Sequence, residues 1–292
     1  MKLLWDQVGD RTYETGVDRG VLYIPSNGIY NRGVAWNGLT GVDEKPTGAE
    51  ATPQYADNIK YLNLISAEAY EATISAFTYP DEFAQFDGVA EPVPGVRVGQ
   101  QTRKAFGYSY RTLKGNDVDG TDLGYLIHLI YGAQAAPSEK NYQTVNDTPA
   151  AIEFSWDVTT SPVDGGSLNG TTFKPTASIT IDSTDVSADD LANFESIIYG
   201  SEGTDARLPL PGEVYSLFAG TALQVVVPTQ PTFADNTITI PATAGVVYSI
   251  GGVAQDAGDV PITENTGVSA SPASGYKFAD NADTYWLYDY SA

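Results

Sequence analysis

Alternation of side chains between two sets marks a β-strand in the first half of the chain. From Glu71 to Tyr79, the residues Ala72, Ile74, Ala76 and Thr78 fall on one side and the residues between them on the other. Because successive side chains of a strand point to opposite faces, this pattern predicts a strand packed on at least one face. Short apolar runs recur along most of the chain, which favours an all-β architecture.

The other predicted strands in residues 1–228 are short apolar runs bounded by Gly, Pro, Asn or Asp. These runs are Arg19–Pro25, Gly33–Leu39, Lys104–Leu113, Gly124–Gly132, Ile152–Thr159 and Ala177–Asp182. The run Leu123–Tyr131 is apolar almost throughout, so periodicity leaves a buried helix open there. We favour a strand.

The segment from Thr40 to Asn58 lacks this periodicity. It contains Pro46, Gly48 and Pro53 among small and polar residues, so we expect a long loop or arm over about residues 40–58. Long loops in compact domains are usually functional, which makes this segment a candidate functional element.

One amphipathic helix is predicted over about residues 188–199. Ser187 is followed three residues later by Asp190, which is the capping-box spacing, and Gly200 supplies a C-terminal stop. The apolar residues that share one face of this helix are Leu191, Phe194, Ile197 and Ile198. We therefore expect the helix to lie on a sheet.

The length of 292 residues and a change in composition near residue 228 indicate two domains. Pro228 and Pro231 mark a linker, after which short strands follow at a spacing of about 8 to 12 residues, as in a small β-sandwich. These strands are Thr237–Ile240, Val246–Gly251, Val260–Thr263, Gly267–Ala270 and Tyr285–Tyr290. The predicted domains are 1–228 and 229–292, and both are mainly β.

The charge of the chain constrains its partners. Fifteen basic residues against 37 acidic ones give a net charge of −22. Such a chain repels the phosphate backbone and lacks the counterion release that drives nucleic-acid binding, so we expect no tight DNA binding. Maintaining solubility explains the charge most simply, but the same charge would let a protein line a passage through which DNA slides without sticking.

Catalytic and cofactor chemistry finds little support in the sequence. There is no cysteine, and the one histidine, His128, lies in the apolar run Leu126–Ile130, where a structural role is expected. Hydrolase elbows, phosphate-binding glycine loops and zinc-protease motifs do not occur in the sequence. We expect no enzymatic activity and no cofactor. No apolar run has the length of a signal peptide or a membrane span, so we also expect no membrane partner.

The sequence contains residues typical of two other chemistries, calcium binding and glycoside hydrolysis. Asn116–Asp122 looks like a calcium loop, but aligning Gly120 with the invariant glycine places Leu126 where a bidentate Glu belongs. An Asx-rich turn between two strands accounts better for these residues. A glycosidase needs two facing carboxylates, yet nothing distinguishes one pair among 37 acidic residues.

A basic stretch interrupts the acidic background. Val96–Asn116 contains no acidic residue before Asp117 and carries five basic ones. They are Arg97, Arg103, Lys104, Arg111 and Lys114. They form either a solvated face or a complement to the carboxylates of a neighbouring subunit. On the second interpretation, charge reversal at Arg103 and Lys104 impairs assembly and leaves the monomer folded.

Several blocks of sequence, taken in order, carry a family resemblance. They are Tyr79–Phe83, Gly99–Gly107, Tyr110–Thr112 with Gly115–Asp117, Gly124–Gly132, and then Pro137–Ser138, Tyr142, Val145–Asp147 and Phe154–Trp156 with Thr159–Val163. Together they resemble the major tail proteins, or tail tube proteins, of long-tailed non-contractile phages. The resemblance covers roughly residues 1–228.

This resemblance implies a β-sandwich flanked by a helix, with six copies in a ring and rings stacked into a tube that conducts DNA during ejection. The arm at 40–58, with Glu44 and Lys45, would contact the next ring, and the basic residues above would join these subunit or ring contacts. The implied partners are further copies of the chain, the tape measure, the tail terminator and the distal tail or baseplate proteins. DNA would pass without specific binding, and the protein would reside in the virion after assembly in the host cytoplasm.

Residues 229–292 resemble the Ig-like or bacterial-repeat modules appended to tail proteins. The likeness is carried by Pro231–Phe233, Thr237–Pro241 and Gly275–Phe278. Such a module would project from the tube, and four aromatic residues could offer a platform for sugar stacking. They are Tyr285, Trp286, Tyr288 and Tyr290. Strand alternation instead predicts Trp286 and Tyr288 as core residues. A polysaccharide-binding or adhesion protein is therefore the alternative function.

Overall fold

The computed structural model describes residues 5, 8–9, 11–144, 147, 151–219, 224–273, 276–279 and 282–291. Three residues used for the family resemblance, Val145, Asn146 and Gly275, lie outside the described residues.

The chain is mainly β, as predicted, and its largest sheet has eight strands. Their order is β2-β1-β9-β10-β11-β6-β3, and β14 pairs with β10 off this path. The bounds are β1 Tyr13–Ser26, β2 Ile29–Trp36, β3 Leu39–Glu44, β6 Glu71–Ala76, β9 Phe106–Asn116, β10 Gly120–Ala135, β11 Phe154–Thr160 and β14 Ser178–Asp182. Every pairing in this sheet is antiparallel.

Local sequence explains several of these elements. The tight turn between β1 and β2 places Asn27 and Gly28 at positive φ, which these two residue types tolerate. In β6 the predicted alternation is confirmed, because Ala72, Ile74 and Ala76 are buried. The ambiguous run after residue 123 belongs to β10, so it is a strand and not a helix.

The inner core lies between the two halves of the curved sheet. Its buried residues alternate along β9 and are joined by aromatic side chains from the neighbouring strands. The largest of them are Trp36, Phe83, Phe86, Phe106 and Trp156, which contact one another edge-on or tilted. Phe83 comes from the short 3-10 helix η1, Asp81–Gln85.

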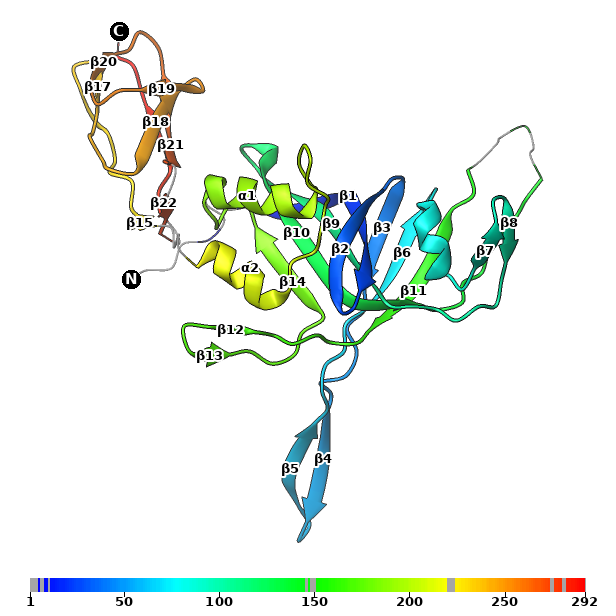
Figure 1. Cartoon of the computed structure of the whole chain (residues 1–292). Helices are drawn as coiled ribbons and strands as arrows, with labels where there is room; N and C mark the ends of the chain where they lie inside the picture. Colours follow the sequence, from blue (N-terminus) through cyan, green and yellow to red (C-terminus); the bar gives the residue numbers. More distant parts are fainter. Residues whose placement is uncertain are drawn as a thin grey trace.

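Two helices cover the opposite face of the β1-β9-β10-β14 part of the sheet (Figure 1). Helix α1, Ala188–Ile198, begins as predicted, with the Ser187 hydroxyl accepting a bond from the Asp190 amide, and its buried face packs on the sheet. Helix α2, Pro211–Phe218, was not predicted. It is short and begins with proline and glycine, so it carries little of the apolar periodicity that predicts a helix.

Residues 40–58, for which a long loop or arm is expected, contain strands and are not a long loop. The segment begins in strand β3 and, after a connection, continues as β4 Ala51–Ala56, which pairs with β5 Ile59–Ile65. The turn residues Asp57 and Asn58 have positive φ values of 49° and 62° and join the two strands tightly. This hairpin extends away from the rest of the chain (Figure 1). The element is a β-arm.

Two more hairpins are small. They are formed by β7 Ala90–Val93 with β8 Val96–Val98, and by β12 Ser167–Leu168 with β13 Thr171–Thr172.

The C-terminal unit is a two-sheet β-sandwich around its own core. One sheet contains β16 Thr232–Ala234, β17 Thr237–Ile240 and β20 Gly258–Pro261, and the other contains β19 Val253–Gln255, β18 Val246–Ile250, β21 Thr266–Pro272 and β23 Tyr285–Tyr288. Strand β15, Gln224–Val226, pairs in parallel with β22, Tyr276–Phe278. Because β15 precedes residue 229 but pairs within this unit, the unit begins earlier than the predicted boundary.

Candidate functional site

The β4–β5 hairpin exposes a concentration of large apolar side chains. Every residue of both strands is exposed, although strands usually bury one face. The exposed apolar side chains are Tyr55 (70%), Ile59 (64%), Tyr61 (70%), Leu62 (40%), Leu64 (58%) and Ile65 (67%). Six large exposed apolar side chains on one short hairpin indicate an interaction site. The hairpin is therefore the strongest candidate contact element in the described chain.

The hairpin tolerates a proline in one of its strands. Pro53 lies in β4, which pairs with β5 alone, so the missing amide hydrogen of the proline removes no hydrogen bond from a central strand. The tip carries one acid, Asp57, for which the described residues show no hydrogen bond or ion pair. The hairpin thus presents apolar side chains around a single acidic tip residue.

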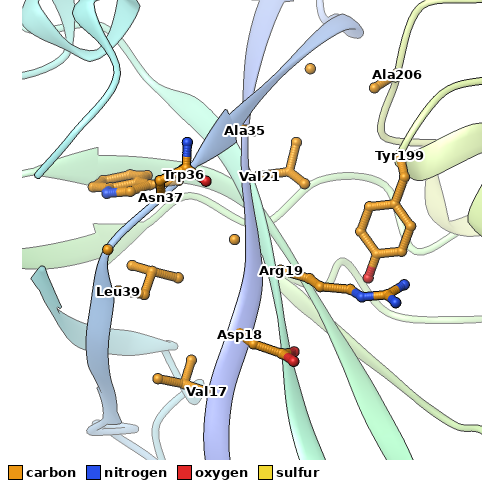
Figure 2. Close-up of a pocket in the computed structure, with 13 residues that line it drawn as sticks. Val17, Asp18, Arg19, Val21, Ala35, Trp36, Asn37, Leu39, Tyr199 and Ala206 are labelled. Carbon is orange, nitrogen blue, oxygen red and sulfur yellow. The ribbon is translucent and has the colours of Figure 1, made fainter.

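A groove of about 550 Å³ runs beside β1 where β2 ends (Figure 2). Its walls include Val17, Trp36 and Leu39 on one side and Tyr199 and Ala206 on the other. β2 pairs with β1 only from residue 20 onward. Residues 13–19 of β1 therefore have a strand edge without a partner on the β2 side in the described structure. Such an edge can accept an added strand.

Arg19 lies in this groove in an unusual backbone conformation. Its φ is +49°, at an irregularity in the β1–β9 register. A positive φ at a residue other than glycine is uncommon and strained. The guanidinium lies over the Tyr199 ring, with its carbon 5.6 Å from the ring centroid, and the two side chains point toward one another in Figure 2. The buried Tyr199 hydroxyl has no hydrogen-bond partner among the described residues.

Arg19 differs from the other arginines in its ionic environment. Within the described chain no carboxylate lies within 4.0 Å of Arg19, whereas each other arginine has one. Those paired arginines are Arg11, Arg32, Arg97, Arg103, Arg111 and Arg207. Its neighbour Asp18 is occupied by Arg111 through two bonds of 2.7 and 2.6 Å. Among the described residues, Arg19 is thus a cation with no carboxylate within 4.0 Å, and it lies beside an apolar groove.

The outward face of β3, β6 and β11 is polar and acidic. The register places Asp43, Thr73 and Asp157 in one row across the three strands. Thr73 donates to Asp157 (2.6 Å), and Lys45 donates to Thr73 (2.8 Å). The other polar residues of this face include Thr40, Glu71, Ser75, Glu153, Ser155 and Thr159. Four carboxylates on this face, at positions 43, 71, 153 and 157, are accompanied by one lysine, Lys45.

The five basic residues of 96–116 do not form one free patch. Arg97 pairs with Asp81 at 2.7 Å, and Lys114 pairs with Asp182 at 2.5 Å. Arg103 bonds to Asp87, whose side chain is 6% exposed, and to two backbone carbonyls. Arg111 is held by Asp18, as described above. Lys104 alone among the five has no carboxylate within 4.0 Å in the described structure, and it donates to Gln85 (3.0 Å). The sequence places these residues together, but the fold assigns four of them to partners within the chain.

Glu44 is engaged within the fold at the end of β3. It accepts bonds from the Tyr70 and Tyr110 hydroxyls, and its carboxylate lies 3.8 Å from His128. The His128 ring stacks on Tyr110 with a centroid distance of 4.5 Å. Burial lowers the pKa of His128 below its usual value, and Glu44 partly opposes this. His128 therefore has the structural position in a strand that the apolar run indicates.

The four C-terminal aromatic residues do not form one platform. Trp286 and Tyr288 are core residues, as alternation predicts, with exposures of 9% and 8%. Tyr285 and Tyr290 are exposed. The predicted alternation in β23 is confirmed, and a sugar platform of all four residues is wrong.

The Asn116–Asp122 segment is an Asx turn between β9 and β10. The Asn116 side-chain oxygen accepts bonds from the amides of Val118 (3.0 Å) and Asp119 (2.6 Å). This confirms the turn interpretation. In the described part of the chain, no group of three or more His, Asp or Glu side chains is arranged to hold a metal ion.

The sequence predicts a functional arm over residues 40–58, which include β4 and the turn, but it does not predict the hairpin form or the second strand β5. Both faces of the hairpin are exposed, so its apolar residues show no useful alternation, although the Asp57-Asn58 pair is a recognisable turn signal. Arg19 was missed because its lack of a counter-charge depends on which acids the fold assigns to the other arginines. No local pattern carries that information.

Comparison with protein-family models gives no match, and comparison with curated proteins gives none either. Over the residues that the structure describes, no helix has both the length and the apolar character of a membrane span.

Proposed function

We propose that this protein is a structural, non-enzymatic subunit that assembles with copies of itself into rings and stacked tubes, as the tail tube protein of a long-tailed phage. The observation that carries the proposal is the projecting β4–β5 hairpin. Its large apolar side chains are exposed in the single chain, and a partner that covered them would remove their apolar surface from water. The resemblance over residues 1–228 supplies the tail tube assignment.

The positions of the hairpin and of the open β1 edge favour a ring or tube over a closed pair. The two elements lie on different parts of the chain, so one subunit can use its hairpin on one neighbour and its β1 edge on another, which is a heterologous arrangement. Heterologous contacts generate closed rings or open filaments, whereas the same contact made reciprocally by two subunits closes a dimer. A protein with a projecting arm and a separate receiving surface is suited to repeated assembly.

The acidic face of β3, β6 and β11 is the proposed lining of the tube. It combines carboxylates with short hydroxyl side chains on an ordered sheet, and Lys45 is its one basic residue among those named above. Negative charge repels a DNA backbone, so DNA passes such a surface without being held. This face would give the tube a conducting and not a binding role.

The remaining partners follow from the tail tube assignment. The tape measure would lie within the tube, and the terminator and distal tail or baseplate proteins would contact its ends. The C-terminal sandwich would project outward as an appended Ig-like module. The particle would be assembled in the host cytoplasm and reside in the virion.

Sedimentation velocity tests self-assembly and the role of the hairpin. The purified chain is measured over a range of concentrations beside a variant with Tyr61→Ser and Leu64→Ser, two exposed positions on β5. We expect large assemblies from the natural chain and a monomer boundary from the variant, with equal thermal stability because these side chains pack on no core. Equal assembly of both chains would remove the hairpin as the contact element.

A further inference from the structure

We propose that the groove beside β1 receives the tip of the β4–β5 hairpin of a second copy, with Arg19 pairing with Asp57 of that copy. This inference rests on the proposed self-assembly and names the contact that would produce it. It assigns a role to Arg19, to the open edge of β1 and to the hairpin tip together.

The groove offers one positive charge in an apolar setting. Arg19 has no carboxylate within 4.0 Å among the described residues, while Val17, Trp36 and Leu39 supply apolar walls. A cation beside an apolar surface favours a ligand that brings one carboxylate and several apolar groups. Arg19 keeps its positive φ at a local energetic cost.

The hairpin tip has the complementary character. Asp57 lies at the turn and Tyr55 and Ile59 flank it, and these two side chains are 70% and 64% exposed. The one cation of the hairpin, Lys60, lies three residues beyond Asp57. The tip therefore carries one carboxylate between apolar side chains. This combination complements the single cation and the apolar walls of the groove.

The occupant is a second copy and not the chain's own hairpin. The hairpin extends away from the body, whereas the groove lies where β1, β2 and the end of α1 meet (Figures 1 and 2). The groove is lined by residues 17–19 of β1, where the strand has no paired strand on the β2 side in the described structure. Main-chain bonds to that edge would add to the Arg19–Asp57 pair.

A charge exchange tests the pair. Arg19→Glu and Asp57→Arg are each expected to raise the concentration needed for assembly roughly tenfold or more, because each leaves like charges facing in the contact. The chain with both changes restores the opposite charges and is expected to assemble at nearly the natural concentration. Thermal melts of all four proteins check that each is folded.

A crosslink provides a readout that does not depend on charge. The chain has no cysteine, so Ala35→Cys in the groove wall and Ala56→Cys beside the tip can be combined without background thiols. Under oxidation we expect disulfide-linked oligomers in a denaturing gel from the combined variant, and no ladder beyond dimers from either single variant.

The outcomes separate this contact from the proposed function. If the natural chain assembles but Arg19→Glu assembles equally well, or the charge exchange fails to rescue and the crosslink does not form, the Arg19–Asp57 contact is wrong and self-assembly stands. If the natural chain stays monomeric at every concentration, the proposed function itself is wrong, and the contact falls with it.

Discussion

Asp87 shows how buried charge is compensated within this fold. Its side chain is 6% exposed and contacts Arg103 at 3.3 Å and Lys140 at 2.6 Å. A buried carboxylate that loses its partners is strongly destabilising, because the charge stays out of water without compensation. Arg103 is thus tied to the stability of the monomer, although in the sequence it is simply one member of a basic stretch.

Charge reversal at Arg103 and at Lys104 is expected to have different effects. Arg103→Glu places like charge beside buried Asp87 and should lower the free energy of unfolding by about 3 kcal/mol. Lys104→Glu, one residue away and exposed, should change it by less than about 0.5 kcal/mol. Urea denaturation followed by tryptophan fluorescence measures both. Equal losses in the two variants would show that the Asp87 cluster is not what stabilises this region.

Charge reversal at Arg103 and Lys104 in one variant is therefore a poor test of assembly, since misfolding of the monomer would by itself cause the loss of tubes. Lys104→Glu is the clean test of whether the basic stretch contributes to subunit contacts. Unchanged assembly in that variant would remove Lys104 from the interface.

His128 gives a prediction for pH. Burial lowers its pKa in the folded protein below the usual 6.5, while Glu44 and Glu14 raise it by a smaller amount. As pH falls below about 6.5 the unfolded chain binds the proton first, so the stability contributed by neutral His128 is present above that pH and is lost toward the folded-state pKa. Because the chain has one histidine, a single imidazole proton resonance reports it directly in NMR.

The expected NMR titration midpoint lies below 6.5, and the fall in unfolding free energy between pH 7 and pH 5 should be smaller in His128→Gln than in the natural protein. A midpoint at or above 6.5 would mean that Glu44, and not burial, dominates the environment of the ring.

Helix α1 is the element that the local sequence predicts most clearly. The Ser187 hydroxyl accepts a bond of 3.2 Å from the Asp190 amide and caps the helix. Ser187→Ala should cost about 1 kcal/mol of stability. Ser196→Ala removes a hydroxyl bonded to the Asn193 carbonyl inside the same helix and serves as the control, with a change of less than about 0.5 kcal/mol. Denaturant titration of the two variants measures the difference, and equal losses would argue against the cap.

Elements with one buried face could be predicted from the sequence, and elements without one could not. β6 and α1 each show the period of their structure because each packs one side on a core. β10 was ambiguous because both of its faces are covered over much of its length, one by the inner core and one by the helices. The β4–β5 hairpin has no buried face, so its sequence lacks the alternation that predicts a strand.

Less of the candidate site than of the fold could be predicted from the sequence. Which acid pairs with Arg97, Arg103, Arg111 or Lys114 depends on strands distant in the chain, such as β1 for Asp18. The arm was located by its position, since residues 40–58 overlap β3 and the hairpin, but its apolar character and its partner groove emerge only from the three-dimensional arrangement.

Removing the hairpin is a test at the scale of the element. Its strands pair with each other and contribute to none of the described cores, so replacing residues 51–65 with a short Gly-Ser linker should leave the thermal midpoint of the body within a few degrees. The same change should abolish assembly in sedimentation. A deletion variant that still forms large assemblies would show that the subunits contact each other elsewhere.

The described residues form two cores on either side of the main sheet and a third in the C-terminal sandwich. The third core is separate, and the sandwich touches the rest of the chain through contacts that include an ion pair between Lys277 and Asp185 at 3.4 Å. Both partners in this pair are substantially exposed, so it contributes little to stability. The C-terminal unit is therefore expected to be dispensable for assembly.

Truncation tests this expectation, and the β15–β22 pairing decides where to cut. A chain ending at residue 228 keeps β15 without its partner strand, whereas a chain ending at residue 219 removes the whole unit cleanly. We expect the 1–219 chain to assemble like the natural protein, with a thinner wall by electron microscopy. Loss of assembly in that truncation would place the C-terminal sandwich within the subunit contact.

Electron microscopy of the purified full-length chain tests the central claim most directly, because it shows assembly, symmetry and the presence of a lumen in one measurement. Negative staining should reveal rings and tubes of uniform diameter with a central channel. Particles that remain single subunits or form only irregular aggregates across concentrations would contradict the proposed tube.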